Sequence, residues 1–135
     1  MDDSIRELVR RRAGDRCEFC RLPQGACPML TFHVDHIIAK QHLDQVIDDP
    51  AFLCLACNRC NAYKGTNLSS IDPETRQLVT LYHPRNDQWD HHFSLHGGEI
   101  DGITPTGRAT VRLLNMNAPQ RVELREQWIL DCGIR

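Results

Sequence analysis

The sequence predicts a small α+β domain whose core is organised around a metal ion. Two Cys-x-x-Cys pairs, Cys17 with Cys20 and Cys57 with Cys60, lie far apart in the chain. Runs of strand-forming residues lie between the pairs, and segments with helical periodicity or helix caps lie before and after them. The chain has 135 residues, enough for one domain with a modest core, so we expect a single domain over residues 1–135.

The first half of the chain predicts a helix, two strands and a second helix. Apolar residues recur at helical spacing over residues 4–13, where the first helix is expected. Residues 30–38 and 51–56 carry the β-branched, aromatic and aliphatic side chains typical of strands. Residues 57–64 predict a short helix, with Asn58 as its N-cap.

The second half predicts a hairpin followed by two helices. Residues 68–90 are expected to be irregular, because they contain the turn-prone sequences DPET and HPRND. Residues 92–103 predict a hairpin that turns at a Gly-Gly pair. Residues 104–115 begin with Thr-Pro and predict a capped helix, and a last helix is expected over residues 119–133.

Composition indicates a globular protein without a membrane partner. No apolar run approaches the roughly 18 residues needed to cross a bilayer. The N-terminal sequence MDDSIRELVRRR lacks the apolar stretch of a secretory signal, so a cytoplasmic location is expected. The net charge of −2 gives no basic field that would indicate a nucleic-acid partner. All but two of the 16 basic residues are arginines, which suit phosphate contacts, but genome composition explains that bias equally well.

The spacing of the cysteines predicts a structural zinc site. Four thiolates in two Cys-x-x-Cys pairs are a usual ligand set for Zn²⁺, with unpaired buried cysteines as the alternative. Cys54 and Cys57 have the same spacing, but Cys54 lies in a predicted strand, where side chains three residues apart face opposite ways. We expect zinc on Cys17, Cys20, Cys57 and Cys60, with Cys54 and Cys132 as buried hydrophobes and Cys27 as a surface thiol.

Polar residues around the second half of this motif predict a hydrolytic site. Hydrolysis of a phosphodiester needs a base for the attacking water and a cation beside the scissile phosphate. His36 is a candidate base, because histidine titrates near neutral pH. Asp35 and Asn61 carry the oxygen ligands that Mg²⁺ or Mn²⁺ prefers. Arg59 and Lys64 are candidates for contacts to the substrate phosphate.

The sequences CEFC, HVDHIIAK and LACNRCNAYKG resemble the motif of HNH endonucleases of the four-cysteine zinc subgroup, which have the ββα-metal fold. The resemblance implies an HNH-like core over about residues 14–66, with a C-terminal extension over about residues 67–135. It implies that His36 is the general base and that Asp35 and Asn61 hold a catalytic divalent metal. The implied activity is cutting or nicking of DNA, with double-stranded DNA as the partner and no covalent enzyme intermediate.

One residue departs from the family pattern. The family has an Asn at the start of its second strand, where it braces the loop that carries the base, and this chain has Phe52 there. Asn58 and Asp49 are candidates to replace that brace. Phe52 favours an alternative function, a catalytically weak or inactive nucleic-acid-binding zinc module. A protein-interaction zinc module is a third possibility, but it gives no reason for the polar residues of the predicted site.

The predicted site also requires an irregular strand. Adjacent residues of a regular strand face opposite ways. Asp35 and His36 therefore share a site only if the strand twists, bulges or ends there, and we predict such an irregularity.

Two further groups of residues allow a functional and a structural interpretation. Four histidines at positions 83, 91, 92 and 96 suggest a second metal site, but we expect one to cap a turn and others to lie on the surface. Two arginine pairs, at 108 and 112 and at 121 and 125, each lie four residues apart on a predicted helix. We expect solvated helix faces, with contact to a phosphate backbone as the alternative.

Overall fold

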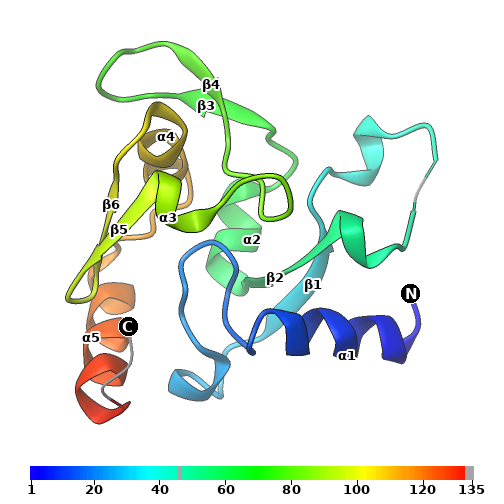
Figure 1. Ribbon diagram of the computed structural model, residues 1–135, viewed down its shortest axis with the longest axis horizontal. Helices are drawn as coiled ribbons and strands as arrows, with labels where there is room; N and C mark the ends of the chain where they lie inside the picture. Colours follow the sequence, from blue (N-terminus) through cyan, green and yellow to red (C-terminus); the bar gives the residue numbers. More distant parts are fainter. Residues whose placement is uncertain (46, 133–135) are drawn as a thin grey trace.

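The computed structural model describes residues 1–45 and 47–132 and has the predicted mixed α+β character (Figure 1). Its strands form separate two-stranded antiparallel sheets, and short helices connect and flank them. The paired strands are β1 (Phe32–His36) with β2 (Leu53–Cys57), β3 (Ser69–Ile71) with β4 (Leu78–Thr80), and β5 (Phe93–His96) with β6 (Glu99–Gly102). The helices are α1 (Asp3–Arg12), α2 (Asn58–Lys64), α3 (Trp89–His92), α4 (Pro105–Leu113) and α5 (Pro119–Cys132).

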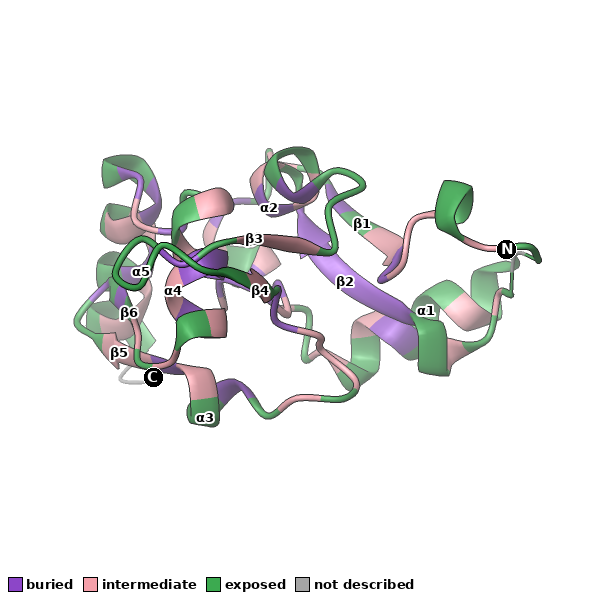
Figure 2. Cartoon of the chain, turned by 90° about the horizontal axis from the view of Figure 1, so that it is seen from above, coloured by how far each residue is buried: buried purple, intermediate pink, exposed green. Residues whose placement is uncertain are grey.

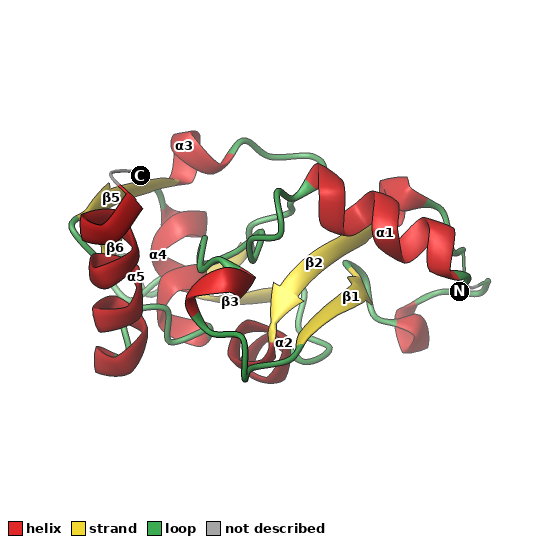
Figure 3. Ribbon diagram, turned by 90° about the horizontal axis from the view of Figure 1, so that it is seen from below, coloured by secondary structure: helices red, strands yellow, loops and turns green. Residues whose placement is uncertain are grey.

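The β1–β2 hairpin is the centre of the N-terminal half. Its register pairs Phe32 with Cys57 and His36 with Leu53. Every residue of β2 is buried, and the strand is purple along its length in Figure 2. The helices α1 and α2 both pack against this hairpin (Figure 3), which explains why β2 reads as a continuous apolar run.

Helix α1 confirms the prediction for residues 4–13 and fixes the start of β2. Asp2 caps it, with its carboxylate accepting a hydrogen bond from the N–H of Ile5 at 3.0 Å. At the other end, the guanidinium of Arg12 donates to the carbonyls of Pro50 and Leu53 at 3.0 and 2.9 Å. These bonds tie the end of α1 to the segment that enters β2.

Helix α2 has a different N-cap from the one predicted. Cys57 is the cap, and its Sγ accepts a hydrogen bond from the N–H of Cys60 at 3.4 Å. Asn58 is instead the first helical residue. Gly65 ends the helix with a φ of 51°, a conformation that glycine adopts at little cost.

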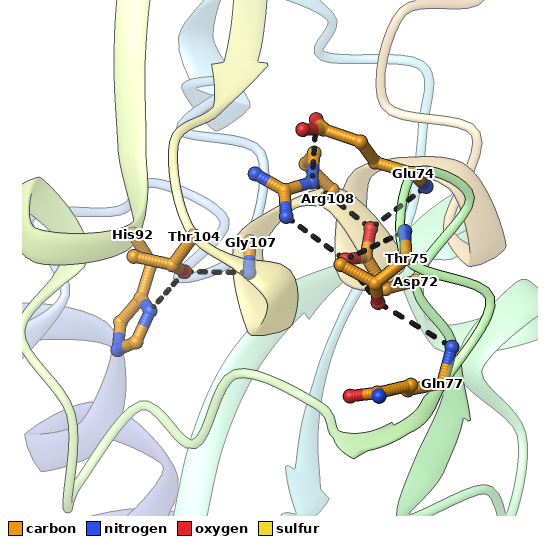
Figure 4. A network of polar contacts seen from close by, with 8 residues as sticks. All are labelled: Asp72, Glu74, Thr75, Gln77, His92, Thr104, Gly107 and Arg108. Carbon is orange, nitrogen blue, oxygen red and sulfur yellow. Dashed lines mark hydrogen bonds and ion pairs between the residues drawn. The ribbon is translucent and has the colours of Figure 1, made fainter.

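The prediction of irregular structure over residues 68–90 was wrong in part, because this stretch contains the β3–β4 hairpin and the start of α3. Asp72 follows β3, is inaccessible to solvent, and accepts hydrogen bonds from Glu74 and Thr75 that shape the turn. Its two carboxylate oxygens also accept from Arg108 of α4, at 2.9 and 2.8 Å (Figure 4). Arg108 is therefore an ion-pair partner of the hairpin and not part of a solvated basic face.

The C-terminal elements follow the sequence prediction closely. The β5–β6 hairpin turns at Gly97-Gly98, and Thr104 caps α4 by accepting from the N–H of Gly107 at 3.0 Å (Figure 4). A Cβ at Gly107 would clash with the carbonyl oxygen of His92, so glycine allows α4 to approach α3 closely. Helix α5 begins at Pro119 as expected, and its predicted end at Gly133 lies outside the described residues.

One buried apolar cluster joins the two halves of the chain. It contains Phe19 and Phe32 from the first half and Phe93, Ile100 and Leu114 from the second. The helices α1 and α5 lie toward opposite ends of the long axis (Figure 1). Val9 of α1 belongs to the cluster, and Leu124 of α5 packs against it. Within the described residues, each helix is too short or too polar to cross a bilayer.

We predict that the Asp72–Arg108 pair makes stability depend on pH. Hydrogen bonds from Arg108 hold the pKa of the Asp72 carboxyl well below its usual range. A carboxyl group with a lowered folded-state pKa contributes stability that is present above about pH 4 and lost as the pH falls further. Asp72→Asn should therefore lower the free energy of unfolding at pH 7, and its difference from the wild type should shrink below about pH 4 in denaturant titrations.

The control for this prediction is Asp44→Asn, which changes an exposed carboxylate. It should leave the free energy of unfolding unchanged at both pH values. A wild-type to D72N difference that stays constant down to about pH 3 would show that the ionised pair does not stabilise the hairpin.

Candidate metal centre and adjacent polar site

Four cysteine sulfurs from two distant segments meet beside the β1–β2 hairpin. Cys17 and Cys20 lie on the loop after α1, Cys57 ends β2, and Cys60 lies in the first turn of α2. All four residues are buried, and their sulfurs lie within 4.8 Å of one another. The 3.8 Å between the Sγ atoms of Cys20 and Cys57 matches a tetrahedron with metal–sulfur bonds of about 2.3 Å, whose edge is about 3.8 Å. The four cysteines can therefore hold one metal ion such as zinc.

Backbone hydrogen bonds build the first cysteine pair into a tight turn. The N–H of Cys17 donates to the carbonyl of Leu22 at 2.9 Å, and the N–H of Arg21 donates to the carbonyl of Cys17 at 3.0 Å. Arg21 has a φ of 66°, in the left-handed region that closes the turn. The turn places both sulfurs on one side, as the two-residue spacing predicts.

For the three cysteines outside the cluster, the predicted burial is confirmed for Cys54 and wrong for Cys27 and Cys132. Cys54 is buried apart from the cluster, and burial raises its pKa to about 12, so it is a neutral thiol. Hydrogen bonds from the neighbouring thiols instead lower the pKa of Cys57. Cys27, expected at the surface, is buried and donates to the carbonyl of Pro23, whereas Cys132, expected to be buried, is exposed at the last described turn of α5.

Two arginines of α5 are buried near this cluster, so the prediction of a solvated face was wrong for them. Arg121 is 5% exposed and donates to the side chain of Asn58 at 2.8 Å. Arg125 is 3% exposed and donates to two backbone carbonyls. Burial lowers the pKa of Arg125, and the negative charge of the cysteine sulfurs, Cys20 first, opposes that shift. Because four thiolates on one divalent ion carry a net charge of about −2, the two guanidiniums offset the charge of an occupied site.

A buried histidine ring lies where β1 ends. His36 is the last residue of β1 and is 8% exposed, and its Nε2 lies 2.9 Å from Oδ1 of Asp48. The hydrogen bond to His36 lowers the pKa of Asp48, so this carboxylate is ionised and can only accept. Nε2 of His36 is therefore the donor in this bond, and in the neutral form of the ring Nδ1 has a lone pair.

Asp48 is a functional candidate that the sequence prediction did not identify. It lies in the long polar loop between the strands, which contains several aspartates that the sequence alone does not distinguish. Of the two proposed braces, Asp49 caps the short helical turn before β2, accepting from the N–H of Ala51 at 2.8 Å. Asn58 accepts from Arg121. The His36 ring is thus contacted by Asp48, the residue just before the predicted brace Asp49.

No bulge is present at Asp35–His36, where an irregularity was predicted. The pairing register runs through both residues, and although the strand ends at His36, the N–H of Ile37 still donates to the carbonyl of Phe52 in the same register. Oδ1 of Asp35 accepts a hydrogen bond from the backbone N–H of His36 at 2.9 Å. The Asp35 side chain is half-buried, and the ring of His36 is buried.

Helix α2 faces the same end of β1. Lys64 is buried, and its Nζ donates to the carbonyl of Ile37, just after β1, at 2.9 Å. Burial lowers the pKa of Lys64, and the negative charge of Asp35 opposes that shift. Asn61 lies three residues before Lys64 and so on the same helix face, half-buried.

Lys64 and Arg59 were both predicted to contact phosphate, but the structure gives them different surroundings. The ammonium of Lys64 is turned inward and holds α2 against β1, so the geometry favours a positioning role over the predicted phosphate contact. The guanidinium of Arg59 lies 5.7 Å from the ring centroid of Tyr63 and forms no ion pair with a described carboxylate. Arg59 thus remains a candidate for phosphate contact.

A cavity of about 70 Å³ lies beside His36. It is far smaller than the roughly 300–1,000 Å³ of sites that enclose a small-molecule ligand, so it has room for water but not for a nucleotide. A substrate must therefore approach from outside. Besides His36, the lining residues are His83 and five apolar residues, Ile37, Ile38, Leu43, Ile47 and Phe52.

Within the described residues, the remaining histidines do not form a second metal cluster. Among the His, Cys, Asp and Glu side chains there, only the four cysteines form a group of three or more that is close enough to share an ion. The prediction that one histidine caps a turn is confirmed at His83. Its Nδ1 accepts hydrogen bonds from the backbone N–H groups of Arg85 and Asn86, both at 3.1 Å.

Comparison of the chain with protein-family models, with curated proteins and with solved structures gave no match. The resemblance to HNH endonucleases rests on the motifs within residues 14–66, and a function has to follow from the geometry of the two sites.

We predict that loss of one cluster cysteine releases the metal and destabilises the fold. Cys20→Ala and Cys54→Ala remove the same thiol from equally buried positions, each 2% exposed. Only C20A removes a ligand, and metal-binding free energy contributes directly to folding in such sites. C20A should lose bound zinc and several kcal/mol of stability, whereas C54A should keep one zinc per chain and lose about 1 kcal/mol.

Zinc content by mass spectrometry and thermal unfolding with and without a chelator measure both effects. Equal zinc content in C20A and C54A, or a wild-type melting temperature that a chelator does not lower, would contradict the assignment of the cluster as a metal site.

Proposed function

We propose that the protein is a metal-dependent HNH-type endonuclease that hydrolyses phosphodiester bonds of DNA and carries a structural zinc ion on its four clustered cysteines. The observation that supports this most is the pairing of His36 with Asp48 at the end of β1. The pair lies at the end of β1, where the Asp35 carboxylate accepts from the backbone N–H of His36 and Lys64 of α2 donates to the carbonyl of Ile37.

The His36–Asp48 pair suits a general base. Asp48 accepts a hydrogen bond from Nε2–H, which fixes the tautomer of the neutral ring and leaves Nδ1 to take a proton from an attacking water. As the imidazole becomes positive, the nearby carboxylate stabilises the new charge, in the way that an aspartate assists a catalytic histidine in hydrolases. The ring is held in place because it is buried at the end of a paired strand.

The oxygen donors near this base fit a hard divalent cation such as Mg²⁺ or Mn²⁺. Oδ1 of Asp35 is bonded to the backbone, and its second oxygen is not used in a hydrogen bond with a described residue. The side-chain amide of Asn61 is likewise without a hydrogen bond to the described residues, and its face of α2 is directed to the end of β1. Magnesium commonly takes only one or two protein ligands and keeps several waters. A divalent ion on Asp35 and Asn61 supplies positive charge to the scissile phosphate and the leaving oxygen.

The zinc site gives this arrangement its rigidity. Cys57 ends β2 and caps α2, and Cys60 lies in the first turn of that helix. Fixing both sulfurs on one ion fixes the direction in which α2 leaves the hairpin, and with it the position of Asn61 and Arg59. Arg59 then offers a planar donor to a phosphate of double-stranded DNA.

Phe52 favours a second candidate function, a nucleic-acid-binding zinc module with weak or no catalysis. The residue is 46% exposed at the edge of the His36 cavity and cannot donate or accept a hydrogen bond through its side chain. The Asp48 contact is the observation that favours the endonuclease, because it holds the histidine ring directly, although Phe52 cannot brace the loop.

We predict that the wild-type protein nicks or cuts plasmid DNA in Mg²⁺ or Mn²⁺ and that His36→Ala reduces the rate by about 10²-fold or more, since a general base contributes on that order. His33→Ala is the matched control, because His33 is an exposed residue three positions earlier on the same strand. H33A should cut at the wild-type rate, and both variants should keep their zinc.

Conversion of supercoiled plasmid to nicked and linear forms measures these rates. A wild-type rate in H36A would exclude the catalytic role of this residue. No cleavage by the wild type in either metal, combined with retained DNA binding, would favour the silent binding module.

We predict that Asp48→Asn lowers the cleavage rate about 10–100-fold, the usual cost of losing a group that orients a catalytic or ligating histidine. Asp44→Asn, in the same loop but exposed and without a contact to His36, is the control and should have no effect. The cleavage assay should be run at saturating metal. Equal rates in D48N and D44N would show that the carboxylate does not assist His36.

A further inference from the structure

His83 has no place in the chemistry proposed so far, yet it lines the same cavity as His36. It lies in the turn between β4 and α3, outside the motif-bearing residues 14–66. The two histidines reach the cavity from segments that are far apart in the chain, so the fold, and not local sequence, places them together.

Hydrogen bonds fix which ring nitrogen of His83 carries the proton. Nδ1 accepts from the backbone N–H groups of Arg85 and Asn86, so it cannot itself be protonated without breaking both bonds. Burial lowers the pKa of His83, and the charge of Lys64 acts in the same direction while Asp87 opposes it. The ring is therefore neutral at physiological pH, with its proton on Nε2 and no described residue accepting it.

The turn that carries His83 is anchored on both sides. The backbone N–H of His83 donates to Oδ2 of Asp87 at 2.9 Å. Arg85 forms an ion pair with Glu18, which lies between the cysteines of the first pair and accepts from the N–H of Leu55 at 2.7 Å. Through Glu18 the turn is thus joined to the loop that carries the first cysteine pair and to β2, so the imidazole of His83 is held rigidly beside the cavity.

We propose that His83 is a further catalytic residue, whose Nε2–H donates a hydrogen bond to a non-bridging oxygen of the scissile phosphodiester. This inference rests on the proposed endonuclease function. It gives the two histidines of the cavity opposite roles, because His36 offers a lone pair on Nδ1 and His83 offers a proton on Nε2.

The proposed step balances without further reagents. The water oxygen forms a bond to phosphorus while a P–O ester bond breaks, and the water proton passes to Nδ1 of His36. The leaving oxygen takes a proton from solvent, and His83 keeps its own proton throughout. A fixed neutral donor of this kind stabilises the extra negative charge on the phosphate oxygens as the transition state forms.

Two substitutions separate this role from capping of the turn. His83→Asn places a carbonyl oxygen near the position of Nδ1, which keeps the cap and removes the donor at Nε2. His83→Gln places an amide N–H near the position of Nε2, which keeps a donor in the cavity. In the zinc-loaded full chain with plasmid DNA and Mg²⁺, H83N should lower kcat about 10²-fold with little change in KM, and H83Q should recover much of that loss.

The outcomes distinguish this inference from the proposed function. If H36A is inactive but H83N cuts at the wild-type rate with intact zinc content, the role of His83 is wrong and the endonuclease proposal stands. If the wild type does not cut, both proposals fail. A nitrogen NMR spectrum of the wild-type protein provides a test that needs no variant: an Nδ1 of His83 that carries a proton at pH 7 would overturn the inference.

Discussion

The convergence of four cysteine sulfurs is the constraint on which the rest of the structure depends. These sulfurs lie within 4.8 Å of one another and join the loop after α1 to the junction of β2 and α2. Because Cys57 belongs to the cluster, ends β2 and caps α2, one sulfur sets the direction of the helix. Lys64 then joins the far end of α2 to the residue after β1. The end of β1, with Asp35 and His36, is thereby held against one face of α2.

The C-terminal half also contacts the elements that carry the cysteine cluster. Arg121 and Arg125 bring two positive charges from α5 to the cysteine cluster, where burial would be costly without negative charge nearby. Arg85 links the turn that carries His83 to Glu18, between the first two cysteines. The cysteine cluster therefore connects the β1–β2 hairpin to the elements that cover it, and a metal ion bound there should affect the stability of the whole chain.

Local signals in the sequence were sufficient for much of this fold. The spacing of the cysteines, the Thr104-Pro105 helix start and the Gly-Gly hairpin each act within a few residues, and the structure has all of them. The features that were missed depend on partners distant in sequence or on the path of a loop. The β3–β4 hairpin is anchored by Arg108, and the buried Arg121 donates to Asn58, which lies far away in the sequence. The partner of His36 lies in a long polar loop, where sequence alone does not select one acidic residue from its neighbours.

The coordination of the metal is the most direct test of this account. X-ray absorption at the zinc K-edge on the purified full-length protein measures the number and type of ligands without a crystal. We expect one zinc per chain with a first shell of four sulfurs at about 2.3 Å. A shell with fewer than four sulfurs, or one containing nitrogen or oxygen ligands, would contradict the account, because the cluster would then not close around one ion.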